Sequence, residues 1–194
     1  MSDSKYAIFT DLHLGVHQNS STWYDITLNW ADWFIGELKS KKIRNIIFLG
    51  DFFHSRSEIS VNTIHTSSEL LKKFSDFNLH MIVGNHDSYY KQKADINSLS
   101  ILNGYPNLQI IDKTISETFN GKKVTFCPWG FDYNDIENSD VIFGHFEIES
   151  FKMNAHKLCE VGVKPKDLLK KSKLIFSGHF HLHEERSYDE GKII

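Results

Sequence analysis

Cysteine, proline and long apolar runs are scarce in this chain of 194 residues, and these scarcities narrow the class of protein. The 2 cysteines, Cys127 and Cys159, stand outside any CxxC or other thiolate-metal pattern, which favours a reducing compartment. No stretch of 18 apolar residues occurs, and the first apolar run is followed at once by Thr10 and Asp11. We therefore expect a soluble cytoplasmic protein with no membrane partner.

Charge of one sign is also lacking, because the formal net charge is only -3 and the sequence pI is about 6.4. Any contact with nucleic acid must then come from a local patch or from bound metal. Histidine, in contrast, is abundant, with 11 residues in the chain. Since imidazole is the commonest metal ligand among side chains, this excess directs attention to the positions of the histidines.

The apolar residues predict a layered α/β fold, with central β-sheets flanked by helices. Three- and four-residue steps of apolar side chains indicate amphipathic helices over residues 23–38 and 59–77. Alternation of strands and helices favours layers around one core, and the length suits a single domain over residues 1–194. The expected buried strands are short runs rich in β-branched and aromatic residues: 6–9, 46–49, 79–83, 141–143 and 174–176.

Later segments are predicted from turn residues and proline. Residues 108–111 and 123–127 resemble paired strands of a later sheet, with Asn120-Gly121 and a polar stretch between them. Pro165 is expected to begin a short helix that runs through Lys170.

A polar cluster follows every strong strand. Because the carboxyl ends of strands form the ligand crevice in open α/β sheets, the clusters are expected to converge at one edge. Their glycines would let the backbone turn tightly where each strand ends. The clusters are Asp11-Leu12-His13, Gly50-Asp51-Phe52-Phe53-His54, Gly84-Asn85-His86-Asp87, Gly144-His145 and Gly178-His179-Phe180-His181.

This set of side chains predicts a site for two divalent metal ions. Carboxylate, amide oxygen and imidazole together suit manganese, iron or zinc rather than magnesium or calcium. Seven ligands are too many for one ion, whereas two ions roughly 3.5–4 Å apart could share one carboxylate, for which Asp51 is the natural choice. The seven candidates are Asp11, His13, Asp51, Asn85, His145, His179 and His181.

Taken alone, each cluster has an ordinary structural interpretation. Asp11-Leu12-His13 could be a turn or a helix cap, and an asparagine after a strand often makes a simple turn. All five clusters in order, each after an apolar run, favour a functional site. The other histidines are interpreted as surface, core or local hydrogen-bonding residues, although His183 could join the site because it alternates with His181.

In order and spacing, the five clusters resemble those of the calcineurin-like metallophosphoesterases, over residues 7–181. The resemblance implies a first metal held by Asp11, His13, Asp51 and His181. It implies a second metal held by Asp51, Asn85, His145 and His179. It also implies that His86 stabilises the transition state or protonates the leaving oxygen, with Asp87 orienting the His86 ring.

Within this family, the sequence departs from the protein Ser/Thr phosphatases, because no Asp-Arg-Gly continuation follows Gly50-Asp51. Residues 50–56 instead resemble the SbcD-type nucleases of double-strand-break repair, in which a histidine at the position of His54 assists catalysis. Residues 144–154 and 178–181 are similar to the bacteriophage recombination nucleases of that group. The resemblance implies manganese-dependent hydrolysis of DNA as exonuclease or endonuclease, an SbcC-type coiled-coil ATPase partner, a homodimer, and the host cytoplasm if a phage encodes the chain.

The end of the chain differs from that group. Residues 191–194 predict the start of a strand, whereas SbcD-type nucleases continue with further core strands and a DNA-capping domain. We therefore expect a nuclease domain that is incomplete at its C-terminal end and has no capping domain. The absent cap favours an alternative, a phosphodiesterase or phosphatase of nucleotides or other small esters. A non-catalytic scaffold is a second alternative, against which stands the full set of candidate ligands.

Overall fold

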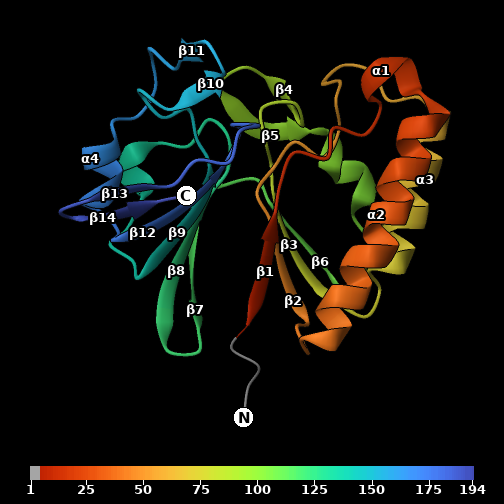
Figure 1. Cartoon of the computed structure of the whole chain (residues 1–194), viewed down its shortest axis with the longest axis horizontal. Helices are drawn as coiled ribbons and strands as arrows, with labels where there is room; N and C mark the ends of the chain where they lie inside the picture. The colour runs from red at the N-terminus through yellow and green to blue at the C-terminus, as the bar shows by residue number, and fades with distance from the viewer. Residues whose placement is uncertain (1–4) are drawn as a thin grey trace.

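Two β-sheets, with helices outside both, form the computed structural model of this protein, which describes residues 5–194 (Figure 1). The first sheet has four parallel strands in the order β1-β2-β3-β6. These strands are β1 (Tyr6–Phe9), β2 (Asn45–Phe48), β3 (Asn78–Ile82) and β6 (Leu108–Ile111).

The second sheet has six strands in the order β13-β14-β12-β9-β8-β7. Its four inner strands run parallel, and the two edge strands, β7 and β13, run antiparallel to their neighbours. The strands are β7 (Ile115–Phe119), β8 (Lys122–Cys127), β9 (Val141–His145), β12 (Leu174–Gly178), β13 (Arg186–Tyr188) and β14 (Gly191–Ile193).

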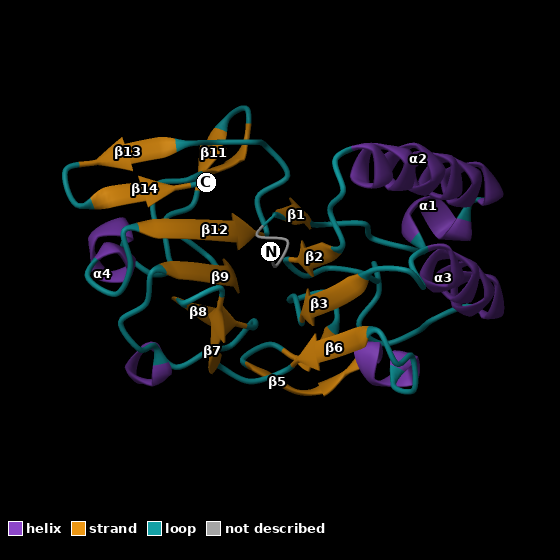
Figure 2. Ribbon diagram, turned by 90° about the horizontal axis from the view of Figure 1, so that it is seen from below, coloured by secondary structure: helices purple, strands orange, loops and turns teal. Residues whose placement is uncertain are grey.

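Helices lie outside both sheets, so the molecule has α, β, β and α layers (Figure 2). Both α2 (Ser21–Ser40) and α3 (Val61–Lys73) lie beside the first sheet, and α4 (Pro165–Leu169) lies beside the second. The start of α3 is capped by Ser60, whose hydroxyl oxygen accepts the N–H of Thr63 at 3.1 Å. The predicted helices are confirmed, although α3 is shorter than the predicted range of 59–77.

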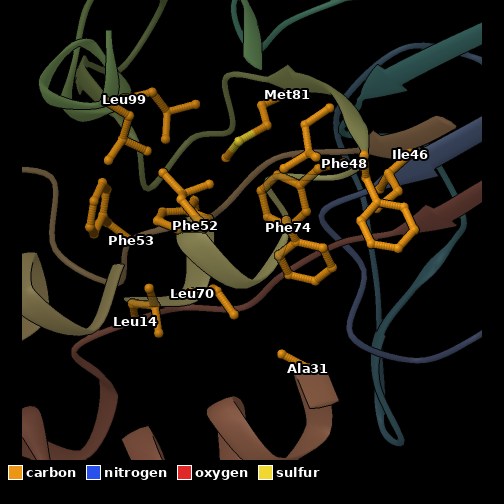
Figure 3. Packing of buried hydrophobic residues seen from close by; sticks show 14 of the residues in the cluster. Leu14, Ala31, Ile46, Phe48, Phe52, Phe53, Leu70, Phe74, Met81 and Leu99 are labelled. Carbon is orange, nitrogen blue, oxygen red and sulfur yellow. The ribbon is translucent and has the colours of Figure 1, made fainter. Parts of the chain in front are cut away.

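Strand β2 shows why the apolar runs are continuous instead of alternating. Ile46 and Phe48 pack into the core beneath α2 and α3, part of which Figure 3 shows. Ile47 and the following Leu49 pack into a second core between the two sheets, with Phe126 and Phe143 from the other sheet. Because both faces of the strand are covered, apolar residues are needed at consecutive positions.

Two pairings differ from the sequence prediction. Strand β6 pairs with β3 in the first sheet, so the prediction that 108–111 pairs with 123–127 is wrong. Strand β8 instead pairs with β7, across the turn at Asn120-Gly121. The predicted helix at Pro165 and the strand near the end of the chain are both confirmed.

None of the helices within residues 5–194 combines the length and the apolar character needed to cross a bilayer.

Short elements complete the fold. The N-terminal α1 (Val16–Asn19) precedes α2, and His17 and Gln18 within it have left-handed backbone angles. Two small hairpins and two 3-10 turns lie in the loops: β4 (Ser88–Tyr90), β5 (Lys93–Asn97), β10 (Lys152–Asn154), β11 (Lys157–Leu158), η1 (Ser98–Leu102) and η2 (Tyr133–Asp135).

Candidate metal centre

The carboxyl ends of β1, β2, β3, β9 and β12 meet on one side of the molecule, at the upper side of Figure 1. One group there joins Asp11 and His13, after β1, to His181, after β12. Nε2 of His13 and Nε2 of His181 each lie 3.7 Å from Oδ1 of Asp11, and the two nitrogens are 3.1 Å apart. These atoms could hold one metal ion.

A second group joins Asp51, His145 and His179, after β2, at the end of β9 and after β12. Nε2 of His145 lies 3.5 Å from Oδ2 of Asp51. The amide oxygen of Asn85 lies 2.8 Å from Nε2 of His145 and 2.9 Å from Nδ1 of His179. The structure thus brings all seven predicted metal residues together, in the two groups expected.

Asp51 connects the two groups. Its Oδ2 lies 3.6 Å from Nε2 of His13 in the first group and 3.5 Å from Nε2 of His145 in the second. Its Oδ1 accepts the backbone N–H of His86 at 2.8 Å, which fixes the plane of the carboxylate. Asp51 is therefore the residue that could contribute to both of two cations held by these groups.

Hydrogen bonding tests whether these residues suit cations. Both carboxylate oxygens of Asp11 are buried without a hydrogen-bond partner among the described residues, which is costly unless a cation compensates them. Nδ1 of His145 donates to the carbonyl oxygen of Leu49 at 2.6 Å, so Nε2 is the ring nitrogen that is left for a metal ion. Nε2 faces the oxygen atoms of Asn85 and Asp51. A divalent cation satisfies all of these atoms, so the residues fit a metal centre.

The charges within the centre are strongly coupled. Burial opposes ionisation of His145, but the neighbouring carboxylate of Asp51 raises the pKa of His145 to about 9. Conversely, although burial raises the pKa of Asp51, the charge of His145 lowers it well below the usual range for a carboxylic acid. Burial, followed by the charge of His145, lowers the pKa of His179 to about 4, so this ring is neutral near pH 7.

Backbone conformation in the centre is unusual. The residues Asp11, His13, Asp51 and His179 have φ angles of 57°, 46°, 60° and 86°, in the left-handed region that side chains other than glycine rarely occupy. Strained backbone conformations of this kind are common at functional sites, where contacts with the surrounding structure hold the residues in place. The parallel strands do so here, because the N–H groups of Asp11 and His13 donate to the carbonyl oxygens of Gly50 and Asp51 at 3.0 Å.

Two glycines allow the strand ends to approach one another. Gly50 has a φ of 106°, and a Cβ atom there would lie 2.4 Å from Nδ1 of His145. At Gly84 the φ angle is not in the left-handed range, but a Cβ atom would lie 2.2 Å from Oδ1 of Asp51. The predicted role in turning the backbone therefore applies to Gly50, whereas Gly84 is required for close packing.

His54 and His86 lie beside the first group. Their rings stack with centroids 5.6 Å apart, and the centroid of His86 is 4.7 Å from that of His13. Nδ1 of His86 donates to the backbone carbonyl oxygen of His54 at 2.7 Å, which leaves Nε2 of His86 as the atom free to act. Nitrogens of His13, His54 and His86 are also close enough to hold a metal ion, so these two histidines have ligation as an alternative to direct catalysis.

Asp87 does not orient the His86 ring, and this prediction is wrong. The carboxylate of Asp87 is fully buried and faces the chain after β2. It accepts backbone N–H groups from Asp51 at 2.9 Å, Phe52 at 3.2 Å, Phe53 at 2.9 Å and Gly84 at 3.0 Å. Burial, and then the charge of Asp51, raises the pKa of Asp87 to about 6. Asp87 therefore holds the two loops that carry Asp51 and Asn85.

Sequence reasoning missed two residues beside the second group. Trp129 lies with its ring centroid 5.4 Å from that of His179 and 6.0 Å from that of His145. Arg56 lines the same cleft. Trp129 belongs to none of the motifs in the sequence. Arg56 ends the segment 50–56 that resembles the SbcD-type nucleases, but the resemblance gave this arginine no role. His183 is exposed and belongs to neither group, in keeping with its interpretation as a surface residue.

Comparison with known proteins finds a relative by sequence and a solved structure with a similar fold. The chain is 33% identical over 190 residues to exonuclease subunit 1 of Enterobacteria phage T4, a match that covers 90% of this chain and 54% of the relative. The chain thus spans about half the length of that relative. The phosphopantetheinyl hydrolase of Mycobacterium tuberculosis shares the fold, with a TM-score of 0.50 and 13% identity over 98% of this chain and 88% of that one.

A second solved structure, of an archaeal phosphodiesterase, has a TM-score of 0.47 and 16% identity, and the match covers 97% of this chain and 81% of that one. The family model for calcineurin-like phosphoesterases matches residues 4–189, which include every strand of the first sheet and both groups of metal-capable residues. The chain therefore belongs to the calcineurin-like phosphoesterase family.

Proposed function

We propose that this chain is a manganese-dependent nuclease domain that hydrolyses phosphodiester bonds in DNA during repair or recombination. The observation that carries the proposal is the position of Oδ2 of Asp51, 3.6 Å and 3.5 Å from the histidines of two metal-capable groups. Two cations held in this way stabilise both the attacking and the leaving oxygens of a phosphoryl displacement. The mixed carboxylate, amide and imidazole ligands suit manganese, with iron or zinc as alternatives.

Seven residues hold the two ions in this proposal, in the two groups that the structure brings together. Asp11, His13 and His181 hold the first ion, and Asp51 contributes to it. Asn85, His145 and His179 hold the second, to which Asp51 also contributes. When bound, the ions supply an activated water and neutralise the charge on the phosphate.

His86 and His54 act on the substrate side of the centre. Nδ1–H of His86 is hydrogen-bonded to a backbone carbonyl oxygen, so Nε2 is the ring nitrogen that faces the substrate. When Nε2 carries a proton, it donates a hydrogen bond to a phosphate oxygen or to the leaving oxygen. His54 stacks on this ring and holds it in place. The charge of His86 is needed only while negative charge develops, so its effect is on the rate and not on metal binding.

DNA is favoured as the substrate by the hairpin of β4 and β5, which follows directly after Asp87. Tyr89 and Tyr90 are 56% and 47% exposed there, with ring centroids 5.0 Å apart. Lys91 and Lys93 are exposed beside them, without an ion pair among the described residues. Exposed aromatic rings next to unpaired cations suit single-stranded nucleic acid, because bases stack on the rings and phosphates pair with the cations. The similarity to a phage exonuclease subunit supports a nucleic-acid substrate.

Two protein partners are part of the proposal. A second copy of this chain would pack on α2, where Trp23, Ile26 and Trp33 are 42%, 48% and 62% exposed on one stripe of the helix. An SbcC-type coiled-coil ATPase would act with the nuclease, as the resemblance of residues 50–56 to SbcD-type nucleases suggests. The relative from phage T4 is itself named as a subunit, which agrees with an assembly.

The proposal is tested by hydrolysis of three substrates side by side with manganese present: linear duplex DNA, single-stranded DNA and bis-p-nitrophenyl phosphate. Asp51→Asn serves as the negative control. Cleavage of DNA by the unmodified chain and not by the variant is the expected result. Turnover of the small diester alone would contradict the nuclease and favour a phosphodiesterase of small esters, and no turnover of any substrate would favour a scaffold.

A further inference from the structure

A second feature of the active face is a cleft of about 600 Å³ beside Asn85, His145 and His179. Its volume lies in the range of sites for small molecules, which is roughly 300–1,000 Å³. Besides the two histidines, the lining includes an aromatic residue, two basic residues and one acidic residue: Trp129, Arg56, Lys91 and Glu147. None of these four residues belongs to the two metal-capable groups.

Trp129 is held rigidly. Its indole N–H donates to the carbonyl oxygen of Lys91 at 2.8 Å, and its backbone N–H donates to Val83 at 2.9 Å. The next residue, Gly130, has a φ of 72° and packs so closely on the hairpin that a Cβ atom would lie 2.6 Å from the backbone of Gln92. A half-buried ring fixed in this manner is a ready surface for stacking, because binding to it orders no further side chain.

The two basic side chains in the cleft are unpaired. Arg56 is half-buried, yet it forms no ion pair or hydrogen bond within the part of the chain that the structure describes. Lys91 is exposed and likewise takes part in none of the ion pairs of the described residues. Guanidinium groups suit phosphate oxygens in particular, since their planar donors match that geometry. Glu147, in contrast, would repel phosphate but could accept hydrogen bonds from the amino groups of a base.

We propose that this cleft is a nucleotide subsite, in which one base stacks on Trp129 while Arg56 and Lys91 contact the adjoining phosphate. The inference rests on the proposed function and extends it to one class of substrate. A base can lie on Trp129 only if it has left the stack of a duplex, so the subsite selects an unpaired nucleotide next to the bond that is cleaved. Stacking requires only an aromatic face, so the subsite accepts all four bases.

Binding gives the first test, independent of catalysis. The probes are thymidine 5′-monophosphate and inorganic phosphate, with their affinities for the manganese-loaded protein measured by calorimetry. We expect the nucleotide to bind roughly 5- to 150-fold more tightly, the ratio that corresponds to the stacking of one base. Trp129→Leu, which keeps apolar volume but no aromatic ring, should remove this ratio, and Trp129→Phe should retain most of it. An unchanged ratio in Trp129→Leu would overturn the subsite.

Catalysis gives the second test, with two substrates that differ only in the base: thymidine 5′-p-nitrophenyl phosphate and the same compound without thymine. Trp129→Leu should lower kcat/KM for the first and leave the second unchanged. An equal loss on both substrates would mean that Trp129 only supports His179, and would overturn the inference. The control is Ile101→Ala, at an apolar residue that is 49% exposed on η1. If both compounds are hydrolysed with the expected preference but DNA is not, the nuclease proposal fails while the subsite stands.

Discussion

The backbone N–H of His86 donates a hydrogen bond of 2.8 Å to Oδ1 of Asp51, 35 residues away in the chain. The bond joins the loop after β3 to the loop after β2, and it leaves Oδ2 as the oxygen that faces both metal-capable groups. The orientation of one carboxylate is thus set by a group that belongs to the candidate catalytic residue. Metal binding and the position of His86 are therefore linked through the same side chain.

Replacement of Asp51 by asparagine should remove both metal ions and abolish turnover. The variant keeps an oxygen atom but loses the negative charge that the two groups share, and an amide oxygen is a weak bridge between divalent cations. Metal content by mass spectrometry and hydrolysis of bis-p-nitrophenyl phosphate are the two measurements. Asp25→Asn, at an exposed carboxylate on α2, is the matched control. Two ions retained by Asp51→Asn would refute the bridging role.

Replacement of His86 by alanine should leave two metal ions in place and reduce the rate by roughly 10²–10⁴, the range for a general acid or an electrostatic stabiliser. The backbone N–H that binds Asp51 survives the change, so the bridging carboxylate should keep its orientation. Metal content and kcat are measured on the same sample. Loss of an ion in this variant would assign His86 to the ligands, together with His13 and His54.

Asp87→Asn is expected to act on stability first. The carboxylate accepts four backbone N–H groups, and an asparagine would turn an NH2 group toward some of these donors. A buried donor left without an acceptor costs about 1–3 kcal/mol, so a loss of about this size in the free energy of unfolding is expected. Denaturant unfolding near pH 8 provides the measurement, with the exposed Asp95→Asn as control. Equal stability of the two variants would contradict the account of Asp87.

The loss of folding stability at acidic pH should depend on His80. Burial lowers the pKa of His80, whose ring stacks on Phe126 with centroids 5.8 Å apart. Because its pKa is lowered, His80 binds a proton less readily in the folded state than in the unfolded state. The neutral ring therefore contributes to the free energy of unfolding above the unfolded pKa of about 6.5, and this contribution is lost as the pH falls below that value. His80→Leu should therefore lose less stability than the unmodified chain between pH 7.5 and pH 5.5. Parallel losses in thermal unfolding would show that other groups govern the acid response.

The exposed apolar residues Trp23, Ile26 and Trp33 on α2 should govern the association of two copies of the chain. Trp33→Glu places a charge at the most exposed of these three residues, and an apolar contact between two copies cannot bury that charge cheaply. We expect the unmodified chain to sediment as a dimer and the variant as a monomer, with circular dichroism unchanged. A monomer in both samples would remove the dimer from the proposal.

Much of the fold follows from local pattern, but the partners of the strands do not. Continuous apolar runs correctly predicted the strands that are buried on both faces, such as β2 and β3. The segment 108–111 was assigned to the wrong sheet, because its residues show that it is a strand without showing which edge is free. The two-sheet arrangement is likewise a property of long-range packing, which a pattern of period two does not encode.

For the site, sequence order was more informative than the residue types alone. Seven predicted metal residues lie together because each lies at the end of a parallel strand or just after it, and parallel strands end at a common edge. The role of Asp87 could not be predicted, because three of its four partners are backbone groups 34 to 36 residues away. Trp129 carries no signal in spacing, and only the cleft beside His179 shows what it can do.

The most direct test of the central claim is crystallographic. Crystals grown with manganese should give two anomalous peaks roughly 3.5–4 Å apart, one on each side of Oδ2 of Asp51. Asp11, His13 and His181 should surround one peak, and Asn85, His145 and His179 the other. A single peak, or a second ion bound among His54 and His86 instead of at His145, would contradict the two-metal centre described here.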